Sequence, residues 1–131
     1  MEKSKIVEFW KEGSKKSLVL ANDVLEKKHY DHALFCGHLT LEKLLKSEVV
    51  KLTDKPAPYS HDLLYLAGLA KIDLNIEQQK FLVEVNSFNI EGRYPEEKLE
   101  FYKSITKDFA NKKLKEIKEF YLWLSKQQEK N

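Results

Sequence analysis

A single arginine stands out in a chain that carries 22 lysines, and it lies in the segment 89–95 (NIEGRYP). The flat guanidinium group of Arg93 offers a fork of N–H donors that suits a phosphate or a carboxylate better than a lysine does. The ring of the neighbouring Tyr94 could stack on a base. Two interpretations remain open: Arg93 binds a nucleotide or phosphate, or it is structural, capping a helix end or pairing with Glu42.

A second set of polar residues follows a helical spacing. His38, Glu42 and Lys46 recur at steps of four and would share one helix face. This spacing allows an intrahelical salt bridge between Glu42 and Lys46, and it also allows Glu42 to orient Arg93 across the fold. His61 opens a predicted helix, as a packing residue or as a site residue. The candidate nucleotide- or phosphate-binding residues are therefore Arg93, Tyr94, Glu42, Lys46, His38 and His61.

Metal binding and standard catalytic chemistry have little support in the sequence. The candidate zinc ligands are His29, His32, Cys36 and His38. Asp31 is a predicted N-cap, which would leave His29 outside the helix, so we expect surface imidazoles, a buried thiol and no metal or cofactor. The phosphate-cradling Gly-rich loop, H-E-x-x-H, C-x-x-C and G-x-S-x-G motifs are absent. We assign no catalytic residue from these patterns.

The elements that must position these residues are predicted to be helices. Apolar residues recur at steps of three and four, and glycine and proline are sparse. Asn75 and Gln78 have the spacing of a capping box. The fold class is therefore all-α, an antiparallel up-and-down bundle of about five helices. The predicted helices cover residues 4–27, 31–52, 61–70, 76–88 and about 104 onward, with irregular segments at 53–60 and 89–97.

Two of the predicted helices carry further information about packing. Gly13, Ser14 and Ser17 keep part of the first apolar stripe thin, which would let another helix approach closely. The last helix has Phe120 and Trp123 beside its main stripe, so it has apolar surface to spare for the core or for a dimer interface.

Composition limits the class of protein. The 131 residues are 42% hydrophobic and 34% charged, which favours one globular domain over residues 1–131 with a core at about 5–125. The net charge of +2 gives no general reason to expect a nucleic-acid binder. One cysteine, no long apolar run and no signal-peptide pattern lead us to expect a cytoplasmic protein without a membrane span.

Four short segments, taken in order, resemble the HEPN domain family. The four segments are Tyr30–Phe35 (YDHALF), Leu41–Lys46 (LEKLLK), His61–Leu63 (HDL) and Arg93–Pro95 (RYP). Trp10 and the last helix also lie where the family has similar features, so the resemblance covers about residues 5–125. The resemblance implies a helical bundle that forms a homodimer. It also implies a possible small nucleotidyltransferase partner in a toxin–antitoxin system, and nucleotide binding.

Many members of that family are metal-independent ribonucleases that use an Arg followed four to six residues later by a His. This chain departs from that pattern, because Glu96–Leu99 follow Pro95 and no histidine occurs after His61. The general acid/base of the ribonuclease is therefore missing. A Gln is also common in the family near position 38, where this chain has His38.

Three functions follow from these observations. The first is a non-catalytic module that binds a nucleotide or a partner protein. The second is a ribonuclease toxin with a rearranged site, in which His61 or His38 replaces the missing histidine. The third is a purely structural interaction bundle in which Arg93 stabilises the fold.

Overall fold

A computed structural model describes residues 2–91 and 93–130 of the chain, and within them it contains six α-helices and no strand. Gly92, which precedes Arg93 in the segment 89–95, lies outside the described residues. The helices are α1 (Lys3–Glu26), α2 (Tyr30–Thr53), α3 (Leu63–Leu69), α4 (Ile76–Asn86), α5 (Pro95–Ser104) and α6 (Lys107–Lys130).

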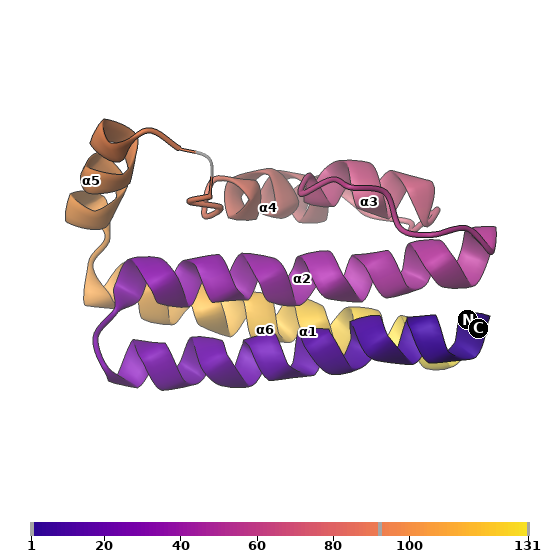
Figure 1. Cartoon of the computed structure of the whole chain (residues 1–131). Coiled ribbons are helices and arrows are strands. Elements are labelled where there is room, and N and C mark those ends of the chain that lie inside the picture. The colour runs from indigo at the N-terminus through magenta and orange to yellow at the C-terminus, as the bar shows by residue number, and fades with distance from the viewer. Residues whose placement is uncertain (1, 92, 131) are drawn as a thin grey trace.

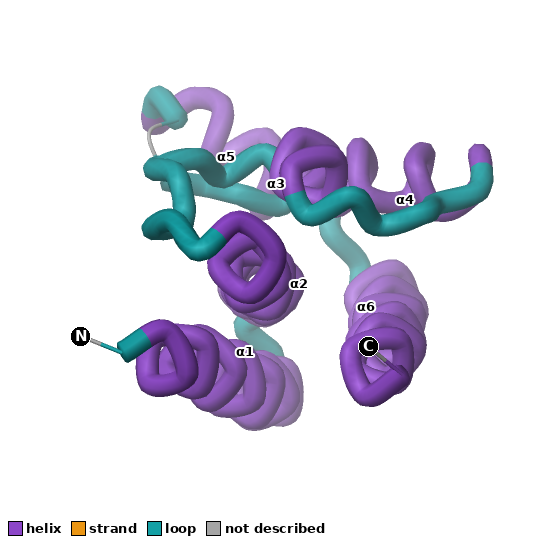
Figure 2. Tube along the Cα trace, turned by 90° about the vertical axis from the view of Figure 1, so that its right-hand side faces the viewer, coloured by secondary structure: helices purple, strands orange, loops and turns teal. Residues whose placement is uncertain are grey.

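The long helices form the predicted antiparallel up-and-down bundle. α1 runs antiparallel to α2, the chain returns along α4, and α6 then runs in the direction of α2, so that both termini lie at the same end (Figure 1). Seen from the end, α2 is central, with α1 and α6 on one side and α3 and α4 on the other (Figure 2). None of the described helices combines the length and the apolarity that a membrane span requires.

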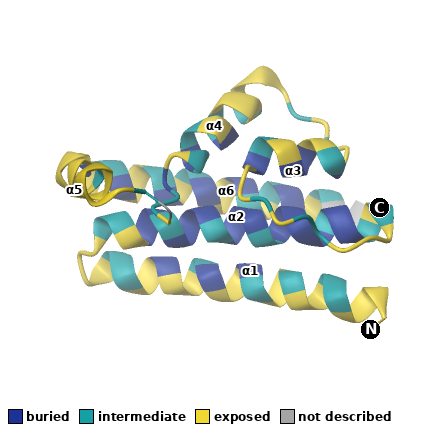
Figure 3. Ribbon diagram, turned by 45° about the horizontal axis from the view of Figure 1, so that its top comes forward, coloured by how far each residue is buried: buried dark blue, intermediate teal, exposed yellow. Residues whose placement is uncertain are grey.

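The core is organised around α2. Its buried positions run along most of its length, whereas α5 has no buried residue (Figure 3). α6 packs closely on Gly37, because a Cβ atom there would lie 2.7 Å from Cδ1 of Ile117 and 3.0 Å from Cδ2 of Leu114. The missing side chain at Gly37 therefore allows α6 to lie this close to α2 at that point.

The thin stripe predicted on the first helix is confirmed. Ser14, Ser17 and Ala21 are the buried residues of α1, and they face α2. The Ser14 hydroxyl donates to the Thr40 carbonyl over 2.6 Å, and Lys43 Nζ donates to Ser17 Oγ over 2.9 Å. Small hydroxyl side chains thus let the two helices approach closely, while the hydroxyl oxygens of Ser14 and Ser17 both take part in hydrogen bonds.

The predicted starts of the second and third helices differ from the structure. α2 begins at Tyr30 with His29 at its N-cap, so Asp31 lies in the first turn instead of capping it. The reason is the tight connection, in which Lys28 has a φ of 67° and leads the chain directly into α2. α3 begins at Leu63, because the side chain of Asp62 caps it by accepting from two backbone N–H groups.

The helix α5 was not predicted, and the last helix, predicted from about residue 104, begins at Lys107 because α5 occupies Pro95–Ser104. α5 has Pro at its first position and two glutamates in its first turn, all favourable for a helix start. Its apolar residues form no strong helical pattern in the sequence, because the helix buries none of its residues. The Asn75–Gln78 capping box at the start of α4 was predicted and is confirmed, with both reciprocal hydrogen bonds present.

Candidate functional site

The loop between α2 and α3 positions the first part of the candidate site. α2 ends at Thr53, and Asp54 adopts a left-handed conformation that turns the chain back. The loop then runs back over α2 (Figure 1). Glu42 lies 11 residues before Thr53, about 17 Å along the helix. The eight residues 54–61 can extend to about 26 Å, so His61 reaches Glu42 with length to spare.

His38, Glu42, Lys46 and His61 form one hydrogen-bonded group, which we call the polar cluster. Glu42 is at its centre: its Oε1 lies 2.8 Å from Nδ1 of His61, and its Oε2 accepts from Lys46 Nζ over 3.1 Å. The side chains of Glu42 and Lys46 are 6% and 7% exposed, whereas that of His61 is 42% exposed. The predicted Glu42–Lys46 salt bridge is confirmed, and it is buried.

His38 is the deepest member of the polar cluster, with no exposed surface. Its Nε2 lies 2.9 Å from the His61 carbonyl oxygen, which can only accept, so Nε2 carries the proton. Its Nδ1 lies 3.8 Å from Glu42 Oε1, too far for a hydrogen bond, and has no other partner among the described residues. Burial lowers the pKa of His38, and the nearby Glu42 charge offsets only part of this effect.

His61 and Glu42 have the geometry of a histidine–carboxylate pair. A carboxylate at Nδ1 fixes the imidazole with its proton on that nitrogen, and the lone pair of Nε2 is then available to a ligand or a proton. The Lys46 ammonium balances the Glu42 charge. Chemically, this arrangement could hold an anionic group near His61, or move a proton at Nε2.

Two aromatic residues border the polar cluster. Lys46 Nζ lies 5.4 Å from the ring centroid of Trp10 on α1. Tyr59, which is 98% exposed, has its ring edge-on to His61 at 5.9 Å. Neither Trp10 nor Tyr59 was predicted from the sequence to belong to the site. The position of Tyr59 in the loop, between Pro58 and His61, is the sequence feature that could have indicated its place beside the site.

Arg93 lies in a different environment. Its Nη2 donates to the carbonyl of Ser87, the C-cap residue of α4, and its guanidinium lies 5.2 Å from the ring centroid of Phe101 on α5. A cation at the C-terminal end of a helix also suits the helix dipole. The interpretation that Arg93 caps a helix end is therefore confirmed. Tyr94 is the N-cap residue of α5 and is 73% exposed.

The six candidate residues thus divide into two places. Four of them form the polar cluster, and within the described residues no hydrogen bond or ion pair joins Arg93 or Tyr94 to that cluster. Glu42 pairs with Lys46 and His61 rather than with Arg93. Sequence spacing could not separate these alternatives, because the path of the α2–α3 loop decides which partner reaches Glu42.

The residues considered as zinc ligands do not come together. His32 is exposed and pairs with Asp31, whereas His38 and Cys36 are buried. Across residues 2–91 and 93–130, no group of three or more His, Cys, Asp or Glu side chains is placed to hold a metal ion.

The chain is thus an all-helical bundle protein whose polar cluster lies between the central helix α2 and the loop that follows it. The comparison with protein families then identifies the group: the HEPN domain model matches residues 7–128, nearly the whole chain, and the chain belongs to the HEPN domain family. Neither the curated proteins nor the solved structures yielded a match to the chain.

Proposed function

We propose that this chain is a single-domain, cytoplasmic, non-catalytic HEPN module that binds a nucleotide or a partner protein. The observation that carries the proposal is the environment of Arg93. Its contacts are the Ser87 carbonyl and the Phe101 ring, and no histidine follows it in the sequence. An arginine can stabilise a phosphate, but its pKa is too high for it to exchange protons near neutral pH.

The turn at Arg93 and Tyr94 retains the groups that a nucleotide would use. The Ser87 carbonyl takes one guanidinium donor, out of the five that an arginine carries. The Tyr94 ring, largely exposed, offers a face for stacking on a base. These two neighbours supply charge-assisted hydrogen bonds and stacking from one short segment, which supports a nucleotide as the ligand.

Family membership extends the proposal to partners. We expect the chain to form a homodimer and to pair with a small nucleotidyltransferase in a toxin–antitoxin system. Exposed apolar residues on the outer side of α1, including Phe9 at 68% and Leu20 at 51%, support an interface there. Light scattering at micromolar concentration should give twice the monomer mass, and a monomer at that concentration would contradict the dimer.

The experiment that tests nucleotide binding is a thermal-shift screen against mono-, di- and trinucleotides. A ligand at 100 times its dissociation constant should add about 2.7 kcal/mol to the free energy of unfolding. Arg93→Ala should abolish the shift, measured from that variant's own melting temperature. Lys103→Ala, which removes an exposed cation at the far end of α5, is the matched control and should keep it.

The outcomes of this screen separate the hypotheses. A shift that is lost only in Arg93→Ala supports a nucleotide site at the turn. If no nucleotide shifts the wild type, the nucleotide part of the proposal fails and a protein partner remains. If Arg93→Ala loses stability yet binds every ligand like the wild type, the arginine acts only as a clamp between α4 and α5.

A second candidate function is a metal-independent ribonuclease with a rearranged site. The observation that favours it is the His61–Glu42 pair, whose 2.8 Å hydrogen bond resembles that of an oriented general base. RNA incubated with the protein and a chelator should then be cleaved, and His61→Gln should lose about a hundredfold in rate. RNA that stays intact with wild-type protein would exclude this function for the chain acting alone.

A further inference from the structure

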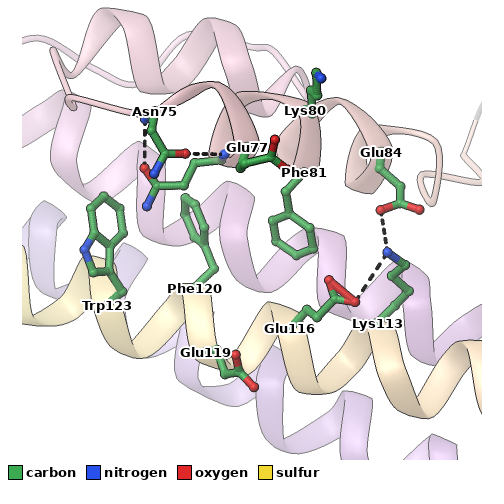
Figure 4. A pocket seen from close by; sticks show the side chains of 11 residues that line it. Asn75, Glu77, Lys80, Phe81, Glu84, Lys113, Glu116, Glu119, Phe120 and Trp123 are labelled. Atoms are coloured by element: carbon green, nitrogen blue, oxygen red, sulfur yellow. Dashed lines mark hydrogen bonds and ion pairs between the residues drawn. The ribbon is translucent and has the colours of Figure 1, made fainter.

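A groove of about 520 Å³ lies between α4 and α6 (Figure 4). In the end-on view, α4 and α6 both lie toward the side of the bundle away from α1 (Figure 2). Three aromatic side chains line the groove: Phe81 from α4, and Phe120 and Trp123 from α6. The ring centroids of Phe81 and Phe120 lie 5.9 Å apart, and those of Phe120 and Trp123 lie 5.4 Å apart. The groove therefore has a continuous aromatic floor.

The rim of the groove is acidic. It carries four glutamates and two lysines, a net charge of −2 in a chain whose total is +2: Glu77, Lys80, Glu84, Lys113, Glu116 and Glu119. The sign of the charge on this face is thus opposite to that of the whole protein. Such a surface repels phosphate groups and attracts cations.

One of the two lysines is already paired within the protein. Lys113 Nζ lies 2.6 Å from Glu84 Oε1 and 3.4 Å from Glu116 Oε1, and bridges the two helices (Figure 4). Burial alone would lower the pKa of Lys113, but the two carboxylates outweigh burial and raise it. Lys113 therefore stays charged and fixes one end of the groove, while Glu77 and Glu119 are exposed carboxylates on the remaining rim.

We propose that this groove binds a basic amphipathic segment of a partner protein. Apolar side chains of that segment would pack on the aromatic floor, and its lysines or arginines would pair with Glu77 and Glu119 and lie over the Trp123 ring. The floor and rim extend from Asn75 to Glu84 on α4 and from Lys113 to Trp123 on α6. Both spans are about 15 Å, the length of roughly three helical turns.

The net negative charge of the rim argues for a cationic partner, and the length of the floor and rim together argues for a peptide. The groove shares no residue with the polar cluster or with the turn at Arg93 and Tyr94. The proposal therefore does not rest on nucleotide binding at that turn, and either one can fail without the other. It does rest on the partner-protein part of the proposed function, for which it names the chemistry of the partner.

An NMR titration of the full ¹⁵N-labelled chain tests the proposal. The probe is a synthetic helical peptide of about 14 residues, with leucines on one face and lysines on the others. Its charge-reversed form, with glutamate in place of lysine, is the control peptide. The basic peptide should shift the amide signals of the groove residues and the indole N–H of Trp123, saturably, and added salt should weaken the binding.

Two charge-reversal variants give the matched comparison. Glu77→Lys/Glu119→Lys should weaken the binding of the basic peptide by at least about tenfold, because it reverses the charge at the two exposed carboxylates of the rim. Glu97→Lys/Glu100→Lys makes the same charge change on exposed residues of α5 and should leave binding within about twofold. Both variants alter exposed side chains only, so we expect both to fold, and their amide spectra would show this.

Several results would overturn the proposal. If the basic peptide binds both variants equally, it is attracted by the net charge of the protein alone. If the amide shifts are centred elsewhere, the peptide binds at a different site. Absence of saturation at millimolar peptide would mean that the groove does not take such a segment. If the wild type self-associates in sedimentation experiments and Glu77→Lys/Glu119→Lys abolishes this, the occupant is a second copy of the chain.

Discussion

Replacing His38 by glutamine should change how the stability of the protein depends on pH. His38 is fully buried, and its Nε2 donates to the His61 carbonyl over 2.9 Å. A glutamine amide can make the same donation, so His38→Gln keeps the hydrogen bond and removes the titration. The charged groups that face His38 are Glu42, His61 and Lys46, and all three remain in the variant.

The magnitude follows from proton linkage. Burial lowers the pKa of His38 below its ordinary value of 6.5, so below that pH the unfolded chain binds the extra proton and the folded chain does not. The contribution of His38 to stability is therefore complete above about pH 6.5 and is lost as the pH falls. For a folded state that stays unprotonated, the loss at pH 5.5 reaches about 1.4 kcal/mol, and it is ~0.1 kcal/mol at pH 7.5.

The assay is urea unfolding of both proteins at pH values about one unit apart, 7.5, 6.5 and 5.5. Circular dichroism and tryptophan fluorescence detect the unfolding. The rest of the sequence is the same in both proteins, so its contribution to the pH dependence cancels in the difference. We expect the wild type to lose up to about 1.4 kcal/mol more than His38→Gln between the highest and lowest pH.

Parallel pH profiles would refute the reasoning. They would mean that the folded protein accepts the proton at His38 as readily as the unfolded chain does. The Glu42 carboxylate, 3.8 Å from Nδ1, would then compensate fully for the burial of the charge.

Three further substitutions probe other parts of the molecule. Lys46→Met leaves the buried Glu42 carboxylate without its cation and should lower the free energy of unfolding by about 3 kcal/mol, whereas Glu42→Leu/Lys46→Met should recover most of this loss. Gly37→Val places methyl groups against Ile117 and should cost about 1–3 kcal/mol. Arg93→Ala removes the cap of α4 and the contact with α5, and should cost about 1 kcal/mol. Urea unfolding measures all of them.

Specific results would contradict these expectations. A double variant no more stable than Lys46→Met alone would mean that the cost came from lost packing rather than from an unpaired charge. A neutral Gly37→Val would mean that α2 and α6 can move apart freely. An Arg93→Ala variant as stable as the wild type would mean that the contacts with Ser87 and Phe101 add nothing measurable in water.

The sequence by itself determined the parts of this protein that depend on neighbours along the chain. Apolar steps of three and four residues predicted the long helices, and the Asn75–Gln78 box predicted the start of α4. The Glu42–Lys46 pair was readable because residues four apart on a helix always face each other. The same local information failed for α5, whose exposed surface carries no strong apolar pattern.

Only the tertiary structure decided which distant residues meet. His61 reaches Glu42 because the loop after α2 folds back along that helix, and no residue spacing encodes the path of a loop. Arg93 caps α4 rather than pairing with Glu42 for the same reason. The groove between α4 and α6 depends on how far apart the two helices pack, a distance set by side chains such as Phe81 and Phe120 that come from opposite walls. Contacts within a helix follow from the 3.6-residue repeat, whereas contacts between helices depend on how the whole core packs.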